Sequence, residues 1–315
     1  MNEADCEAGS KAMRVTACGK SAGERTCARR NHDLFRKGAD RLSTFLLWTS
    51  MAFVSTVLCA ILFYLASKGR GALSWEFVTA PPRNGMTEGG IVTPIVGTLQ
   101  LILVSMCFAF PVGVVTAVYF NEYASAGALK KTLRLTMRSL ASIPSVVLGL
   151  FGLAFFCTFL RFGASLLSAG LTLGCMVLPT IVTASETALA NVPRDYRDAS
   201  YALGATEWQT IYKVILPSAF PGIITGGILS VGRVAGETAP IMFTGAVFFA
   251  PGFARSVFDS VMALPYHVYV LATAGTNIEK TTPLQYGTIL VLIAVVLGIS
   301  TVGMAARSRL RKDVL

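Results

Sequence analysis

The sequence predicts an all-α integral membrane protein with about six transmembrane helices. Of its 315 residues, 53% are hydrophobic and only 14% are charged, and the mean hydropathy is +0.61. Soluble domains carry about 25% charged residues, so a chain with so few is expected to be solvated largely by lipid. Six stretches are apolar over the roughly 20 residues that a helix needs to cross a bilayer.

The apolar runs set the bounds of the six predicted spans. Three of the runs contain no Asp, Glu, Lys or Arg. The third is interrupted by Arg138 near its start and by Pro144, and the fourth reaches Glu186 at its end. In order, the spans are expected at about Thr44–Ala66, Pro94–Phe120, Leu135–Leu160, Ser165–Thr187, from Ala219 to between Pro240 and Ala250, and Leu284–Ala306.

The basic residues orient these spans in the membrane. If the N-terminus is cytosolic, 20 of the 27 Lys and Arg residues fall in segments on the inner side and 6 in segments on the outer side. Cytosolic segments of membrane proteins carry such an excess of Lys and Arg. Both termini are therefore predicted to be cytosolic, with residues 1–43 contributing much of the excess.

Two regions are expected along the chain. Residues 1–43 would form a basic cytosolic tail next to anionic lipid headgroups, and residues 44–315 would form the transmembrane domain. The predicted outer segments of residues 67–93 and 251–283 are long enough to carry function. The second is apolar enough to hold a short re-entrant or interfacial helix.

The composition argues against several classes of protein. The net charge of +10 invites a nucleic-acid partner, but the basic residues lie between apolar segments and form no single polar patch. The seven cysteines show no CxxC spacing, so neither a metal site nor a disulfide framework is predicted. His32 and His267 are the only histidines, and no nucleophile–base pair is visible, so the chain is not predicted to be an enzyme.

The predicted inner loop of residues 189–219 has the composition of a structured segment. Pro193 suits the first turn of a helix, and Asp195 and Asp198 favour that end through the helix dipole. The helical stretch would end at Gly204, because glycine commonly caps the C-terminus of a helix.

A second short helix is expected from Thr206 to Leu216, before Pro217. The two helices would form a compact knob that exposes Tyr201 and Leu203, apolar groups that usually require a partner. An ordinary interfacial hairpin explains the same composition equally well.

The fifth predicted span places two opposite charges inside the membrane. Arg233 and Glu237 are four residues apart and so lie on one helix face. A charge at the bilayer centre costs about 3 kcal/mol by insertion scales, so both should face the bundle interior. We hypothesise that the pair is functional; the alternative is an ion pair that only locks helices together.

The loop of residues 189–219 resembles the EAA loop of ABC-importer permeases, E-A-A-x3-G-x9-I-x-L-P. The spacing is kept at every element, with Asp, Ser and Val replacing Glu, Ala and Ile of the pattern. In that family the loop is the coupling helix that sits in a groove of the ATPase subunit. The resemblance therefore implies an ATPase-coupling role for Asp198, Ala199, Ser200, Gly204, Leu216 and Pro217.

Three further runs resemble the PstA-like permeases of phosphate importers. Residues 232–240 match G-R-x-x-G-E-T-A-P, residues 143–152 read IPSVVLGLFG, and residues 119–123 are similar to Y-L-x-E-Y. The G-E-T-A-P ending resembles PstA more than its partner PstC. The resemblance covers about residues 44–306 and implies a type I importer permease fold of the MetI-like kind.

This resemblance implies a multi-subunit transport system in a bacterial inner membrane. The chain would form the path for inorganic phosphate with a PstC-like permease, two PstB-like ATPase subunits and a PstS-like phosphate-binding protein. No G-x4-G-K-[ST] pattern occurs, so ATP and Mg are expected on the ATPase partner and no cofactor on this chain. Arg233 would attract the anion and Glu237 would limit its affinity, with Thr238 and Ser145 supplying hydroxyl donors.

Two other functions stay open. An ABC permease for another oxyanion, such as phosphonate, sulfate or molybdate, would have a similar coupling loop. A secondary transporter, driven by ions through Arg233, Glu237 and Glu122, is a different class that the spaced loop disfavours.

Overall fold

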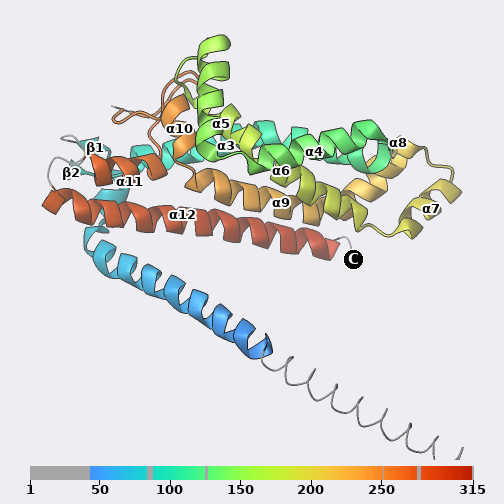
Figure 1. The fold of residues 1–315 in the computed structure, drawn as a ribbon, viewed down its shortest axis with the longest axis horizontal. Helices are drawn as coiled ribbons and strands as arrows, with labels where there is room; N and C mark the ends of the chain where they lie inside the picture. Colours follow the sequence, from blue (N-terminus) through green and yellow to red (C-terminus); the bar gives the residue numbers. More distant parts are fainter. Residues whose placement is uncertain (1–42, 84–87, 125–126, 251, 275–277, 314–315) are drawn as a thin grey trace, which may run out of the picture. The chain divides into compact units, whose positions relative to one another are not determined.

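A computed structural model describes residues 43–83, 88–124, 127–250, 252–274 and 278–313 (Figure 1). The predicted tail of residues 1–43 therefore lies outside the described residues, except for Ser43. The chain divides into two compact units, Met1–Tyr64 and Leu65–Leu315. The described part of the first unit is helical and belongs to a helix, Ser43–Ala72, that contains the first predicted span.

The second unit is built on four long helices that run side by side (Figure 1). Helix α6 packs against α3 and α9, and α9 packs against α12. In the described residues, five helices are long and apolar enough to cross a membrane, and a sixth is added if one bent pair counts as a span. The prediction of about six spans is confirmed. The bounds are Val92–Val118 for α3, Leu166–Ala190 for α6, Leu216–Gly236 for α9 and Ile278–Asp313 for α12.

The third predicted span is wrong as a single helix. It consists of α4 (Ala128–Ser142) and α5 (Ser145–Gly152), and the π-helical segment η4 (Leu153–Phe159) extends α5. The two halves meet at 102°. Ile143 and Pro144 are extended there, with ψ of 131° and 139°. Proline has no N–H to continue a helix and disfavours helical geometry in the preceding residue, so the break falls at this dipeptide.

The fifth predicted span ends earlier than expected. Helix α9 stops at Gly236, and Glu237 is extended, with φ of −79° and ψ of 133°. A separate short helix, α10 (Ala239–Thr244), follows this break. Arg233 therefore lies in the last turn of the span, not at its middle.

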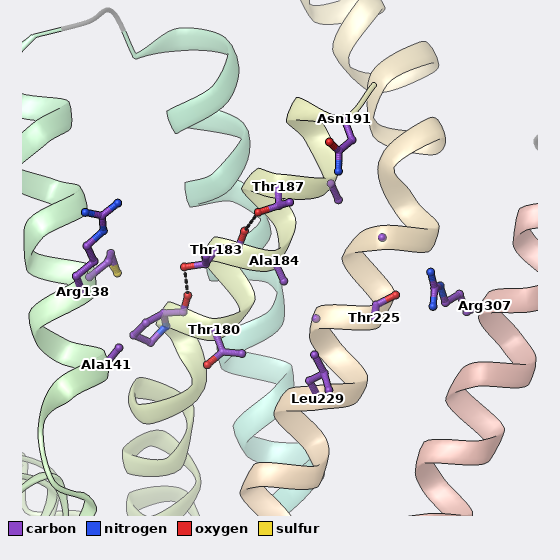
Figure 2. Close-up of a pocket in the computed structure, with 15 residues that line it drawn as sticks. Arg138, Ala141, Thr180, Thr183, Ala184, Thr187, Asn191, Thr225, Leu229 and Arg307 are labelled. Carbon is purple, nitrogen blue, oxygen red and sulfur yellow. Dashed lines mark hydrogen bonds between the residues drawn. The ribbon is translucent and has the colours of Figure 1, made fainter. Parts of the chain in front are cut away.

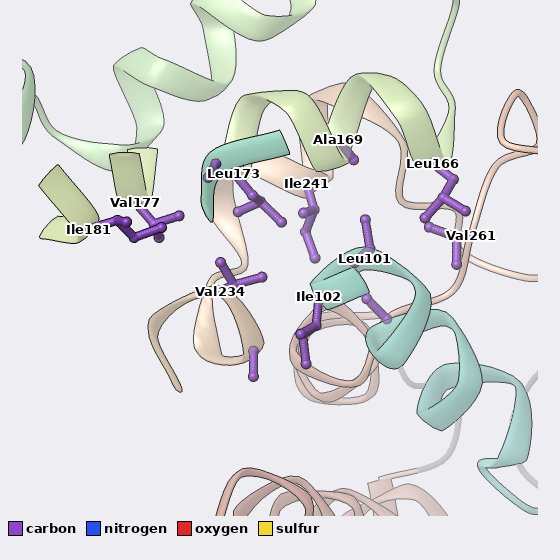
Figure 3. Close-up of a cluster of buried hydrophobic side chains, with 13 residues drawn as sticks. Leu101, Ile102, Leu166, Ala169, Leu173, Val177, Ile181, Val234, Ile241 and Val261 are labelled. Atoms are coloured by element: carbon purple, nitrogen blue, oxygen red, sulfur yellow. The ribbon is translucent and has the colours of Figure 1, made fainter. Parts of the chain in front are cut away.

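The main buried cluster joins α3, α6, α9 and α10 (Figure 3). Lipid is as apolar as these side chains, so close packing and small residues hold such helices together. Gly170 illustrates this, because a Cβ placed there would lie 2.5 Å from Cγ1 of Val104. The cluster contains Leu101 and Ile102 of α3, Leu173 and Val177 of α6, Val234 of α9 and Ile241 of α10.

The segments between the spans hold short elements. One contains η1 (Arg70–Ala72), α2 (Trp75–Thr79) and two antiparallel strands, with Pro82 of β1 (Pro82–Arg83) opposite Gly89 of β2 (Glu88–Gly89). The predicted short helix in residues 251–283 is present as α11 (Leu264–Thr273).

Helix α11 carries a buried histidine with a shifted pKa. Burial lowers the pKa of His267 to about 4, and its Nδ1 has no hydrogen-bond partner among the described residues. The unfolded chain keeps the ordinary value near 6.5, so it binds more protons than the folded chain between these two pH values. His267 therefore has no effect on the free energy of unfolding above about pH 6.5, and it lowers that free energy as the pH falls below this value.

We expect acidification from pH 7.5 to pH 5 to cost about 2 kcal/mol through His267, at about 1.36 kcal/mol per pKa unit. Replacing His267 with glutamine, which does not titrate, should flatten the pH dependence of the unfolding temperature over this range. The backbone N–H groups of Ser256 and Arg255 lower the pKa of Asp259, so this carboxylate titrates below the pH range of the measurement. An equal pH slope in both proteins would contradict the assignment.

Candidate functional site

The predicted pair of short helices is present between α6 and α9. Helix α7 (Arg194–Ala202) begins directly after Pro193, and α8 (Glu207–Thr210) begins at a capping box formed by Thr206 and Gln209. The π-helical segment η5 (Ile211–Ile215) follows α8. We call residues 194–215 the α7–α8 knob.

The predicted coupling residues of α7 point in different directions. Asp198 and Ala199 are exposed, whereas Ser200 is buried. The Ser200 hydroxyl lies 2.9 Å from that of Thr210, so it joins α7 to α8 inside the knob. Ser200 therefore connects the two helices inside the knob, whereas Asp198 and Ala199 lie on its surface.

Gly204 makes the turn between the two helices. Its φ is +78°, in the left-handed region that side chains with a Cβ avoid. Apart from its chain neighbours, no atom of the described residues lies within 4 Å of the position that a Cβ would occupy. Glycine is therefore favoured here by the backbone conformation, and the neighbouring described residues do not crowd the position.

The tip of the knob is apolar and exposed. Leu203 is 90% exposed, and Tyr201 is nearly half exposed. On α8 and η5, the exposed rings of Trp208 and Tyr212 stack with centroids 6.4 Å apart. Isolated exposed apolar residues are ordinary, but a cluster with stacked aromatic rings is typical of a surface that binds another protein.

Leu216 and Pro217 do not end the second helix, which corrects the prediction. The chain is helical from Glu207 to Gly236, a single candidate span of 30 residues. The Leu216 N–H bonds the carbonyl of Ile211, five residues back, as in a π-helix. This wider turn accommodates a proline, which has no N–H to continue the usual pattern. The second half of the knob, from Glu207, and the fifth span therefore form one continuous helix.

An ion pair that sequence reasoning missed joins the knob to α3. The Arg197 guanidinium lies 2.9 Å from the Glu122 carboxylate, with side chains only 19% and 11% exposed. Arg197 also donates to the backbone carbonyls of Val192 and Leu189. Glu122 belongs to η3 (Tyr119–Tyr123), the π-helical end of α3, in one of the runs that resemble phosphate permeases. The resemblance of that run to phosphate permeases was the only indication in the sequence that Glu122 is important, and nothing in the sequence identified Arg197 as its partner.

Arg233 and Glu237 lie together at the end of α9. The Arg233 Nε is 3.7 Å from the Glu237 Oε1, and the two side chains are 41% and 20% exposed. The Ser145 hydroxyl lies close enough to the Glu237 carboxylate to interact with it electrostatically, and Thr238 is the N-cap residue of α10. The four residues predicted for the substrate path thus occupy the junction of α5, α9 and α10.

This geometry bears on the alternative that the ion pair locks helices together. Arg233 pairs with a residue of its own segment, so the pair does not bridge two spans. The approach of Ser145 to Glu237 and the contact of Gly149 with Pro240 connect α5 to the segment that follows α9. Arg233 is 41% exposed within this pair, so the protein does not fully cover its guanidinium.

The runs of residues 143–152 and 232–240 also pack closely against each other. A Cβ on Gly149 would lie 2.8 Å from the Cα of Pro240, and one on Gly152 would lie 2.2 Å from the Thr172 hydroxyl oxygen. Glycine at both positions lets α5 approach α10 and α6. The two runs are distant in sequence but form one structural unit around Glu237.

A cavity of about 620 Å³, which the sequence did not predict, lies among α4, α6, α9 and α12 (Figure 2). Arg138 and Arg307 border it from opposite sides (Figure 2). We call it the arginine cavity. Its polar lining also includes Thr180, Thr183, Thr187, Asn191 and Thr225, and its apolar lining includes Ala141, Ala184 and Leu229.

Comparison with protein families identifies a family that matches most of the transmembrane region. The family described as binding-protein-dependent transport system inner membrane component matches residues 109–314.

Several relatives match most of the chain. The probable ABC transporter permease protein YqgI of Bacillus subtilis is 30% identical over 271 residues, which cover 82% of this chain and 92% of the relative. The phosphate transport system permease protein PstA of Mycobacterium leprae is 34% identical over 282 residues, covering 86% and 90%. The protein of the same name from Pasteurella multocida is 35% identical over 210 residues, covering 66% and 74%.

Solved structures share the fold at lower identity. A chain of the MetNI methionine ABC transporter, in inward-facing conformations, aligns with a TM-score of 0.58 at 22% identity, covering 70% of this chain and 95% of that one. A chain of a bacterial alginate ABC transporter, in complex with an alginate-bound periplasmic protein, aligns with a TM-score of 0.62 at 15% identity, covering 84% and 93%.

Proposed function

Because the chain belongs to the family of binding-protein-dependent transport system inner membrane components, we propose that it is a permease subunit for the import of inorganic phosphate. The membership itself makes the chain a multi-pass component of an ABC importer, which works with an ATPase and a substrate-binding protein. The finer assignment concerns the substrate and the identity of the partners.

The relation to phosphate permeases carries the substrate assignment. Two relatives named as phosphate transport system permeases are 34% and 35% identical to this chain over most of their length. The two runs that resemble those permeases meet at Glu237, through Ser145 and through the contact of Gly149 with Pro240. An exposed guanidinium at that junction suits an oxyanion, because arginine presents several N–H donors in a fixed fork.

The α7–α8 knob is proposed as the docking element for the ATPase. Its apolar tip supplies the surface, and its helix continues into the fifth span up to Gly236. ATP-driven closure of two PstB-like subunits would move the knob, and the continuous helix would carry that motion to Arg233. ATP and Mg would bind on those subunits, and this chain would bind no cofactor.

The remaining partners follow from the same proposal. A PstC-like permease would complete the path, and a PstS-like protein would deliver phosphate from outside an inner membrane. Both termini of this chain would be cytosolic, on the same side as the knob and the ATPases. Arg233 would hold the anion briefly, and Glu237 would keep its affinity low enough for release.

Labelled-phosphate uptake tests this function. Cells that lack their own high-affinity phosphate system should gain ATP-dependent uptake when they express the chain with its partners. Uptake that needs an ion gradient but no ATP would contradict the ABC mechanism. An assembled complex that moves sulfate, molybdate or phosphonate, but no phosphate, would keep the mechanism and overturn the substrate.

A further inference from the structure

We propose that the arginine cavity is a second binding station for phosphate, distinct from the site at Arg233 and Glu237. The shared chemistry is that of a phosphate-type oxyanion, which either free phosphate or a lipid headgroup would provide. The cavity's hydrogen bonding favours free phosphate. The inference rests on the proposed function, because the same anion would occupy both sites.

The charge of the cavity points to an anion. Arg138 and Arg307 line it, whereas no Asp or Glu does so. Neither guanidinium has an ion-pair partner in the described part of the chain. Glu186 is close in sequence to the lining residues of α6, but it pairs with Arg134 instead. Both arginines are exposed, and charge-assisted hydrogen bonds from guanidinium groups to an oxyanion are strong, so an anion between the two would be stabilised by them.

The hydroxyl groups of the cavity favour a ligand that carries a proton. The hydroxyls of Thr183, Thr187 and Thr225 each donate to a backbone carbonyl four residues earlier. Their protons are thus engaged, while their oxygen lone pairs are free to accept. Phosphate is protonated near neutral pH and has a P–OH group to donate, whereas sulfate and the diester of a phospholipid have none. The two arginines and the Asn191 amide would supply donors to the unprotonated oxygens.

The cavity continues the face of α9 on which Arg233 lies. Gly222, Thr225, Gly226 and Leu229 line it at intervals of three and four residues, and Arg233 follows at the same interval. Residues so spaced share one helix face. Thr225 and Arg233 are eight residues, or about 12 Å, apart along the axis. An anion released from Arg233 would therefore meet the next cationic site along the same surface.

Protection of a thiol placed in the cavity tests this station directly. The assembled complex carrying Thr225→Cys would be held in nanodiscs of zwitterionic lipid and treated with a small thiol reagent. Peptide mass spectrometry would read labelling at position 225 separately from the native cysteines. We expect inorganic phosphate to slow this labelling and sulfate at the same concentration to leave it unchanged.

A matched pair of arginines near the end of α12 provides the control. Arg307→Gln should raise the phosphate concentration for half protection about tenfold, the usual effect of losing one charged hydrogen-bond donor. Arg309→Gln removes the same charge two residues away, outside the cavity lining. It should change the phosphate concentration for half protection less than twofold. Equal effects of the two substitutions, or no protection by phosphate, would overturn the station.

Two further arms separate the alternatives. Protection by anionic lipid in nanodiscs without phosphate would assign the cavity to a lipid headgroup and overturn the station for free phosphate. Uptake by the unsubstituted complex is measured in parallel. If that complex imports phosphate but phosphate gives no protection, only the station fails; if it imports no phosphate, the proposed function fails first.

Discussion

Phosphate uptake is expected to fall by roughly tenfold or more when Arg233 is replaced by glutamine in the assembled transporter, the effect of losing a charged hydrogen-bond donor. Arg233 lies in the last turn of α9, and its side chain is 41% exposed beside Glu237. Glutamine keeps much of the length and polarity of the side chain but removes its charge. The measurement is the initial rate of labelled-phosphate uptake, normalised to the amount of complex in the membrane.

Two further substitutions separate charge from packing. Arg233→Lys should recover part of the uptake, because it restores the charge without the guanidinium fork. Arg255→Gln, in an exposed segment between α10 and α11, removes an arginine elsewhere and should leave uptake unchanged. Normal transport by a double variant, Arg233→Gln with Glu237→Gln, would show that the pair is dispensable.

ATP hydrolysis and transport are expected to become uncoupled when Gly204 is replaced by valine. Gly204 has a φ of +78°, and a residue with a Cβ pays about 1–2 kcal/mol to adopt that conformation. A β-branched residue would drive the turn to another geometry and move α7 relative to α8. We expect the complex to insert and assemble, but to import little phosphate per ATP hydrolysed.

Asparagine at the same position distinguishes conformation from contact. Asn tolerates the left-handed region better than other residues with a side chain, so Gly204→Asn should keep the turn. If Gly204→Asn couples well and Gly204→Val does not, the turn itself is what coupling requires. If both fail equally, the partner needs a bare backbone at this point. Full coupling in Gly204→Val would overturn the role of the knob.

Much of the architecture was predictable because lipid imposes simple rules on sequence. Long apolar runs located the spans, and the spaced EAA pattern located the knob. The solved importer structures confirm the predicted type I fold, and the relatives confirm the resemblance to PstA-like permeases. The orientation of the termini stays a prediction, as do the roles of the individual site residues.

The prolines show where such rules stop. Pro144 breaks the third span by 102°, whereas Pro217 lies inside a continuous helix. Local sequence gives both residues the same preference, since each lacks an N–H. The difference lies in the neighbouring hydrogen bonds, because a π-helical turn precedes Pro217 and an extended dipeptide contains Pro144. Helix propensity alone does not predict whether the chain breaks at a proline or continues through it with a π-helical turn.

Partners distant in sequence were also beyond prediction. Glu122 and Arg197 are each ordinary charges beside a span, and only the fold shows that they pair. The arginine cavity could not be predicted for the same reason, since Arg138 and Arg307 come from α4 and α12, which are far apart in sequence. No local pattern in the sequence links them.

The contact of α5 with α10 has a consequence for engineering substrate choice. Gly149 faces Pro240 at a distance that leaves no room for a Cβ, and Ser145 lies beside Glu237. A chimaera in which only one of these two runs is replaced by that of another oxyanion permease would pack a foreign segment against a native one. Residues 143–152 and 232–240 therefore make up a single interchangeable cassette, and chimaeras that divide it should fail to fold before their selectivity can be measured.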